Sequence, residues 1–171
     1  TMENVIINKV AESGIITINL EDFLAKEEIV IFDIKPLLFR ELILKEKDFR
    51  ELLKNTDWQA YNGKVVGITN TADAIIPMWA YMLVASYLQP FAKNVLFGDE
   101  ATVKQMLLLE NIENINAGDY EEKRIVIKGC GDIALPEAAY VVITGKLRPV
   151  VKSLMFGEPC STVPVYKKPA R

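Results

Sequence analysis

Two cysteines and a group of carboxylates are the side chains of this 171-residue sequence that could support catalysis or bind a metal ion. Histidine is absent, which excludes Ser–His and Cys–His nucleophile pairs and every metal site that includes a histidine ligand. Cys130 stands between Gly129 and Gly131, directly before a predicted helix, and a helix N-terminus favours the thiolate form of a cysteine. Cys130 is therefore a candidate nucleophile or metal ligand. The competing interpretation is a small buried residue in a glycine-rich turn.

Cys160 follows Glu158 and Pro159 in the run FGEPCSTVP, in which two prolines stiffen the backbone and Ser161 supplies a hydroxyl group. Two thiolates with carboxylates nearby are suitable ligands for zinc or iron, so Cys130 and Cys160 together form the candidate metal site. Two isolated cysteines are a much weaker metal signal than a doubled CxxC motif. A structural role for the second loop is the competing interpretation.

Carboxylate side chains near these cysteines could act as acids, bases or further metal ligands. Asp73 and Asp132 each precede a predicted helix, so they are most simply interpreted as N-caps that accept a hydrogen bond from a free helical amide. Asp99 has the same interpretation at its own helix. Glu158 has no predicted helix after it and is the stronger candidate for a functional carboxylate. The Gly129–Gly131 stretch lacks the third glycine of a dinucleotide fingerprint, and the sequence contains no Walker-type loop.

An internal repeat organises the second half of the chain. Residues 64–99 align without gaps on residues 123–158, at a constant offset of 59, and 11 of the 36 aligned positions are identical. The identities include Asp73 with Asp132 and Pro77 with Pro136, which are residue types that mark turns and caps. The repeat predicts that both copies fold in the same way.

Each copy has the pattern of a strand, a helix and a second strand, which is the βαβ unit. Short β-branched runs predict the first strands, and longer apolar runs predict the helices. The chain is predicted to be α/β, a single domain over residues 1–171, with a mixed, mostly parallel sheet and helices on both faces. The predicted strands are Ile15–Asn19, Ile29–Ile34, Val65–Thr69, Asn94–Phe97, Ile125–Lys128 and Ser153–Phe156, and the predicted helices are Lys47–Lys54, Ala74–Leu88, a helix from Asp99 to about Ile112, and Ile133–Leu147.

Ligands of open α/β sheets bind beyond the carboxyl ends of the strands. The predicted sheet has four loops at that edge, namely Asn70–Asp73, Gly98–Asp99, Gly129–Asp132 and Gly157–Thr162, and both cysteines lie in them. Thr71 has the place in the first copy that Cys130 has in the second. The candidate pocket therefore consists of Cys130, Cys160, Asp132, Glu158, Asp73, Thr71 and Ser161.

Composition limits the classes of partner and compartment. The formal net charge of −3 is close to balance and argues against a dedicated nucleic-acid binder. Two cysteines are too few for a disulfide framework, and the first residues lack the pattern of an export signal, so we expect a reducing, cytoplasmic setting. Residues 74–92 carry no charge, but prolines near both ends and flanking strands favour a buried helix of a soluble protein over a membrane span.

Three stretches resemble an uncharacterised bacterial family, one of the domains of unknown function, and the resemblance covers nearly the whole chain. The stretches are FDIKPLLFRELILKEKDF at Phe32–Phe49, the segment Asn70–Tyr81, and KSLMFGEPCSTVPV at Lys152–Val165. The family-like runs within or beside them are IKGC at Ile127–Cys130, FGEPCSTVP at Phe156–Pro164 and KEKDFRE at Lys45–Glu51. The resemblance implies no activity and no catalytic residue. It does imply a gene neighbourhood concerned with iron–sulfur cluster assembly, and hence a protein partner from that process.

Two functions from different classes follow. The first is a non-enzymatic binding or accessory module whose two cysteine loops meet a metal ion, a cluster or a partner protein; a homo-oligomer could complete a metal site from two chains. The alternative is a small cytoplasmic enzyme with a pocket centred on Cys130. The absence of histidine favours the first, because a nucleophilic thiol usually needs an adjacent base.

Overall fold

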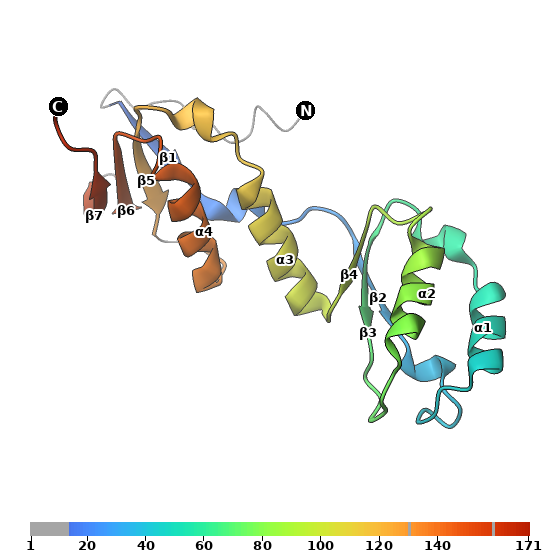
Figure 1. Cartoon of the computed structure of the whole chain (residues 1–171). Helices are drawn as coiled ribbons and strands as arrows, with labels where there is room; N and C mark the ends of the chain where they lie inside the picture. Colours follow the sequence, from blue (N-terminus) through green and yellow to red (C-terminus); the bar gives the residue numbers. More distant parts are fainter. Residues whose placement is uncertain (1–13, 130, 159) are drawn as a thin grey trace. The chain divides into compact units, whose positions relative to one another are not determined.

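The structure is a computed structural model that describes residues 14–129, 131–158 and 160–171 (Figure 1). The chain divides into two compact units: unit 1 comprises residues up to 25 and from 105 to 171, and unit 2 comprises residues 26–104. The α/β class is confirmed. The described strands form two sheets, one in each unit, where the sequence predicted one. The single domain over residues 1–171 stays a prediction.

Unit 2 is built on three parallel strands in the order β2-β3-β4, which are Ile29–Asp33, Val65–Thr69 and Asn94–Phe97. Helices α1 (Glu46–Lys54) and α2 (Met78–Leu88) lie on the same side of this sheet, with α2 nearer to the strands (Figure 1). Phe49 of α1, Val84 of α2 and Val66 of the central strand are fully buried in one apolar cluster. Burying one such side chain contributes roughly 1.5–3 kcal/mol, so this apolar layer holds the strand ends in place.

On the opposite face of β3, neighbouring atoms fill the space that a side chain at Gly67 would need. A Cβ atom there would lie 2.8 Å from the carbonyl oxygen of Gly98 and 2.8 Å from Cγ2 of Val103. Val103 belongs to the first turn of α3 (Glu100–Glu113), which begins directly after the predicted N-cap Asp99. Asp99 Oδ1 accepts a hydrogen bond from the amide of Thr102 at 2.8 Å, which confirms that predicted cap.

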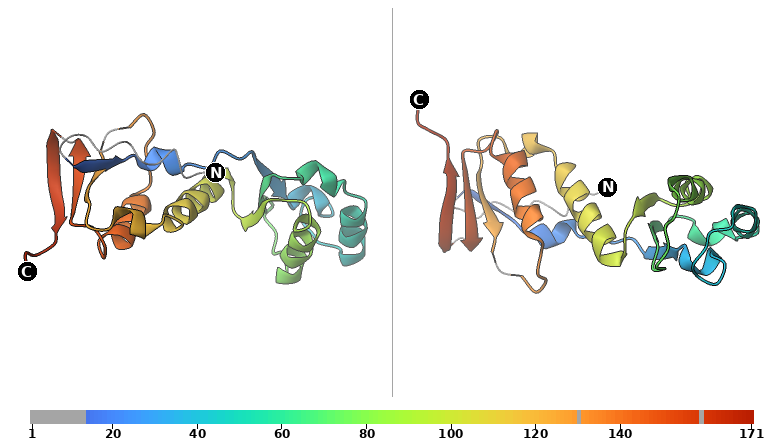
Figure 2. Two further views of the ribbon diagram at one scale, coloured as in Figure 1. Left: turned by 90° about the horizontal axis from the view of Figure 1, so that it is seen from above. Right: turned by 60° about the horizontal axis from the view of Figure 1, so that its bottom comes forward.

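Unit 1 contains four strands in the order β1-β5-β6-β7, namely Ile15–Ile18, Arg124–Lys128, Ser153–Glu158 and Ser161–Lys167. The first three are parallel, and β7 lies antiparallel beside β6 at the edge (Figure 2). Helix α4 (Glu137–Leu147) packs on this sheet, where Ile143 is buried with Ile125 and Leu154. The predicted loop Gly157–Thr162 is thus a β-hairpin, because Glu158 pairs with Ser161 across a two-residue turn.

Element boundaries recur at the 59-residue offset of the sequence repeat. Strand β3 corresponds to β5 and α2 to α4. The correspondence extends upstream of the predicted copies, because α1 matches the last nine residues of α3, and the 3₁₀ helix Trp58–Tyr61 matches Ala117–Tyr120. Even the caps agree: Asp57 and Asn116 each accept a hydrogen bond from the amide two residues ahead.

The helices of the repeat begin four residues later than predicted, and the predicted capping roles of Asp73 and Asp132 are wrong. Pro77 and Pro136 are the N-cap residues, with ψ angles of 144° and 147°. A residue before proline avoids the helical region, so the preceding residues stay irregular and the helix starts only after the proline. Asp73 and Asp132 are consequently exposed loop residues that lie outside any cap.

Helix α2 is apolar nearly all round, but only one stripe of it is fully buried. Ala80, Val84 and Leu88 face the sheet at a four-residue spacing. The uncharged run of residues 74–92 favoured a buried helix, yet the side chain of Met82 is 71% exposed and that of Met78 is 72% exposed. Helix α2 thus carries no charged residue, yet it is not buried on all sides within unit 2.

Candidate functional site

The predicted pocket residues follow strands of both sheets. Thr71 and Asp73 follow β3 in unit 2, whereas Asp132 follows β5 in unit 1. Glu158 is the last residue of β6, Ser161 the first of β7, and Cys160 lies in the turn between them. Cys130, the centre of the predicted site, lies outside the described residues. Each sheet therefore has its own carboxyl edge and its own set of candidate residues.

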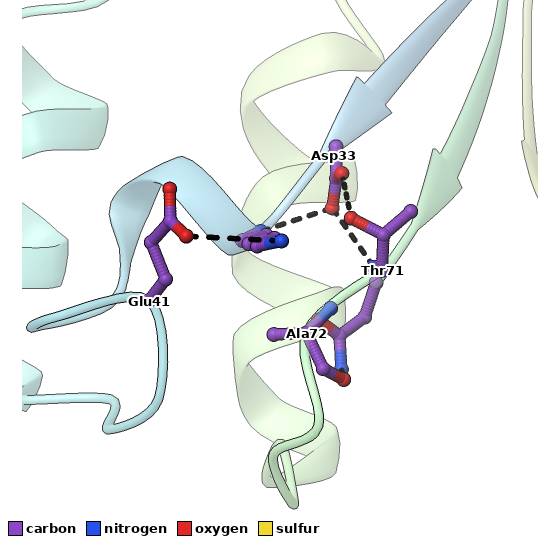
Figure 3. Close-up of polar contacts among 6 residues, drawn as sticks. Asp33, Glu41, Thr71 and Ala72 are labelled. Carbon is purple, nitrogen blue, oxygen red and sulfur yellow. Dashed lines mark hydrogen bonds and ion pairs between the residues drawn. The ribbon is translucent and has the colours of Figure 1, made fainter.

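The carboxyl edge of unit 2 is organised by Asp33, the last residue of β2 (Figure 3). Its Oδ1 atom accepts hydrogen bonds from the amides of Lys35 at 3.0 Å and Thr71 at 3.1 Å. Its Oδ2 atom accepts a hydrogen bond from the Thr71 hydroxyl. The pairing of β2 with β3 brings the two segments together, because Asp33 stands opposite Thr69 in the ladder.

The environment of Asp33 favours its ionised form. Partial burial acts to raise the pKa of this carboxyl, but the hydrogen bonds from Thr71 and from the amide of Lys35 outweigh that effect, so the pKa lies below its ordinary value. Lys35 also pairs with Glu41 at 3.7 Å (Figure 3). Asp33 therefore joins the segments that carry Lys35 and Thr71 through its own hydrogen bonds.

Asn70 fixes the backbone of the loop that carries Thr71. Its Oδ1 atom accepts from the amide of Ala72 at 3.0 Å, and its Nδ2 donates to the carbonyl of Ala74 at 3.2 Å. Sequence reasoning selected Thr71 but missed Asp33. The available signal was its place at the carboxyl end of a predicted strand, where ligand-binding and loop-bracing carboxylates gather.

The carboxyl edge of unit 1 is braced by Glu21, another residue that sequence reasoning missed. Its Oε1 atom accepts a hydrogen bond from the amide of Ile133 at 3.1 Å, and its own amide donates to Asn19 Oδ1 at 3.0 Å. A Cβ atom on Gly131 would lie 1.9 Å from that carboxylate oxygen. The missing side chain at Gly131 therefore leaves the space that the Glu21 carboxylate occupies beside this loop.

The backbones that lead to the two cysteines are in contact. The amide of Gly129 donates to the carbonyl of Gly157 at 3.3 Å, and a Cβ atom on Gly129 would lie 3.0 Å from the Cα atom of Gly157. Gly157 has a φ angle of +123°, a conformation that glycine readily adopts. Cys160, three residues further on, has an exposed free thiol.

A cavity of about 390 Å³ opens between α4 and strands β6 and β7 of unit 1. Its lining is mainly apolar, and Tyr140 and Phe156 meet there edge to face with ring centroids 5.9 Å apart. Phe156 and the strand residues Val163 and Val165 remain 39%, 61% and 55% exposed. This side of the hairpin is suited to apolar contact rather than to acid–base chemistry.

Within the described part of the chain, no cluster of three or more Cys, Asp or Glu side chains is arranged to bind a metal ion. The metal site predicted for Cys130 and Cys160 includes a residue outside that part and stays a prediction. Among the same described residues, no helix combines the length and the apolar character needed to cross a membrane.

The fold and the two edges define an α/β protein with two parallel-stranded units, each with its loops at a carboxyl edge. The chain belongs to the family described as protein of unknown function (DUF2480), whose model matches residues 4–168. This confirms the resemblance that the sequence motifs indicated. No curated protein matches the chain, and no solved structure matches it.

Proposed function

We propose that this protein is a non-enzymatic accessory module that binds a thiophilic metal centre, such as an iron ion or an iron–sulfur cluster, through the cysteine-bearing loops of unit 1. The family resemblance links the proposal to proteins of iron–sulfur cluster assembly. The observation that carries it is the contact between Gly129 and Gly157, because the backbones leading to Cys130 and Cys160 meet there.

The donor set suits such a centre. Two thiolates are soft ligands for iron and zinc, and the carboxylates of Glu158 and Asp132, on the same two segments, offer oxygen ligands. Cys160 is exposed at the turn of the β6–β7 hairpin, where a partner protein can reach it. The apolar side of the hairpin, with Val163 and Val165 exposed, supports contact with such a partner.

Reconstitution of the untagged full-length protein tests the proposal. The protein is incubated anaerobically with ferrous iron and sulfide, and separately with Zn²⁺, and retained metal is measured after desalting. We expect the wild-type protein to retain metal and the Cys130→Ser and Cys160→Ser variants to lose it. The Thr162→Val variant is the matched control, because it alters a nearby hairpin residue outside the candidate pocket without removing a thiol. Absence of retained metal in the wild type, or normal retention in both serine variants, would overturn the proposal.

Thiol reactivity against pH separates this function from the Cys130-centred enzyme. A catalytic thiol needs a pKa well below the ordinary cysteine value of about 8.5, so an enzyme would show one thiol that reacts rapidly near neutral pH. Comparing the Cys130→Ser and Cys160→Ser variants assigns the reactivity to one residue. Rapid reaction that is confined to Cys130, together with absent metal retention, would favour the enzyme.

A further inference from the structure

Basic side chains gather at the amino-terminal edge of the unit 1 sheet, the edge opposite the cysteine loops. Residues 123–171 contain nine Lys and Arg but three Asp and Glu, although the whole chain has a net charge of −3. Six of these basic residues lie where β5 and β6 begin and where β7 and the chain end; they are Lys123, Arg124, Lys152, Lys167, Lys168 and Arg171. We call this set the basic edge.

Backbone hydrogen bonds place three lysines of the basic edge in a row. The amide of Lys152 donates to the carbonyl of Lys123 at 2.8 Å, and the amide of Lys168 donates to the carbonyl of Lys152 at 2.9 Å. Neighbouring strands lie ~4.8 Å apart, so these residues follow one another at about that spacing. Concentrated like charge of this kind is unfavourable in the isolated protein and is relieved by an anionic partner.

The basic edge already contains one bound carboxylate. A hollow of about 440 Å³ is lined by Glu122 together with Lys152, Lys167, Lys168 and Arg171. Glu122 pairs with Lys168, and the hydrogen bond from Lys168, with the charges of Lys168, Lys152 and Arg171, lowers the pKa of the Glu122 carboxyl. The surrounding cations thus recognise a carboxylate group in this geometry.

The backbone at Glu122 shows that this side chain is retained against a conformational cost. Its φ angle is +57°, in the left-handed region that favours glycine. The position 59 residues earlier is Gly63, with a φ angle of +73°. Unit 2 thus has glycine at this turn, whereas unit 1 carries a glutamate that points its carboxylate to the lysines. Strain of this kind is typical of sites where a side chain has a function.

We propose that the basic edge binds an acidic segment of a partner protein, in which Asp and Glu side chains take the place of the Glu122 carboxylate. Single-stranded nucleic acid is less well matched, because bases need exposed aromatic faces and the ring of Tyr166 is covered by the Arg148 guanidinium at 4.5 Å. An anionic membrane surface would meet the same lysines. The carboxylate already bound in the hollow favours the acidic peptide over both.

Fluorescence anisotropy with a labelled oligoglutamate peptide tests this proposal on the full chain. We expect binding that weakens with salt and that falls about tenfold in the double variant Lys152→Gln/Lys168→Gln, which removes two positive charges that would each pair with a peptide carboxylate. The matched control is Lys47→Gln/Lys54→Gln, which removes the same charge from α1 of unit 2 and should bind normally. Circular dichroism verifies that both variants are folded.

Removing the internal carboxylate gives a second, opposite test. Glu122→Gln frees Lys168 and should strengthen peptide binding more than Glu121→Gln, which makes the same change of charge one residue away. Labelled oligothymidylate and phosphatidylserine vesicles are the competing probes. Absence of peptide binding, equal loss in the two lysine double variants, or tighter binding of either competing probe would overturn the proposal. None of these results depends on metal retention, so failure here leaves the thiol site of unit 1 untouched.

Discussion

Replacing Asp33 by alanine should destabilise unit 2 by about 2 kcal/mol. The change removes one acceptor group that takes three hydrogen bonds: two from the amides of Lys35 and Thr71, and one from the Thr71 hydroxyl. A hydrogen bond to a charged group contributes about 1.5–3 kcal/mol when it is buried. Asp33 is only partly buried, so water compensates for much of the loss and the total stays near the value for one such bond.

The same carboxylate predicts a pH dependence with a defined sign. The pKa of the Asp33 carboxyl in the folded state lies below the ordinary value of 3.8, so folding stabilises the ionised form of this side chain. The stabilisation is complete above pH 3.8 and is lost as the pH falls through the folded pKa. The difference in unfolding free energy between the wild type and Asp33→Asn should therefore shrink below about pH 4.

Urea unfolding followed by tryptophan fluorescence measures these effects in the relevant unit, because both tryptophans, Trp58 and Trp79, belong to unit 2. Asp57→Ala is the matched control: the same substitution removes a carboxylate that accepts one hydrogen bond, from the amide of Gln59 at 3.2 Å, and should cost about 1 kcal/mol or less. The reasoning about Asp33 would be refuted if the two substitutions cost the same, or if the Asp33→Asn difference grew as the pH was lowered.

Two further predictions concern packing and backbone. Gly63→Ala should destabilise unit 2 by about 1–2 kcal/mol, because φ there is +73°, although no atom lies near the new methyl group. Gly145→Ala should stabilise unit 1 by about 0.5–1 kcal/mol, because this glycine lies inside helix α4. Chemical denaturation should therefore show changes of opposite sign in the unfolding free energy. Met82→Ala should change the unfolding free energy by no more than about 0.5 kcal/mol, whereas Leu88→Ala on the same helix should lower it by about 2–5 kcal/mol. Similar costs for the two substitutions would contradict the finding that only one side of α2 is fully buried.

Most strands and helices could be predicted from the sequence because their signals are local. The strands Val65–Thr69 and Asn94–Phe97 were predicted with the bounds they have, since short, mainly apolar runs between turn residues have few alternatives. The helix after Asp99 also begins where its cap predicts. The helix starts at Met78 and Glu137 were missed because an aspartate was preferred as a cap over the conformational effect of the following proline.

The division into two sheets could not be read from local patterns. Strands β1 and β2 are near neighbours in the sequence and both are apolar, yet β1 pairs with β5 and β2 pairs with β3. Nothing in either strand identifies its distant partner. The bracing residues Asp33 and Glu21 were missed for the same reason, because each contacts a loop that lies far away in the sequence.

The pairing registers show how the two carboxyl edges differ, and this difference supports the choice of unit 1 for the proposed metal site. Ile18 pairs with Ile127 and Phe32 with Ile68, so the next residues, Asn19 and Asp33, have matching places in the two sheets. Asp33 uses its charge to close the edge of unit 2 on the Thr71 hydroxyl, so both of these groups are engaged within the fold. In unit 1 the matching residue is the neutral Asn19, which accepts a hydrogen bond from the amide of Glu21, and the repeat has a cysteine where unit 2 has that threonine. These two changes support the proposed function, because unit 1 has an amide and a thiol at the places where unit 2 joins a carboxylate to a hydroxyl.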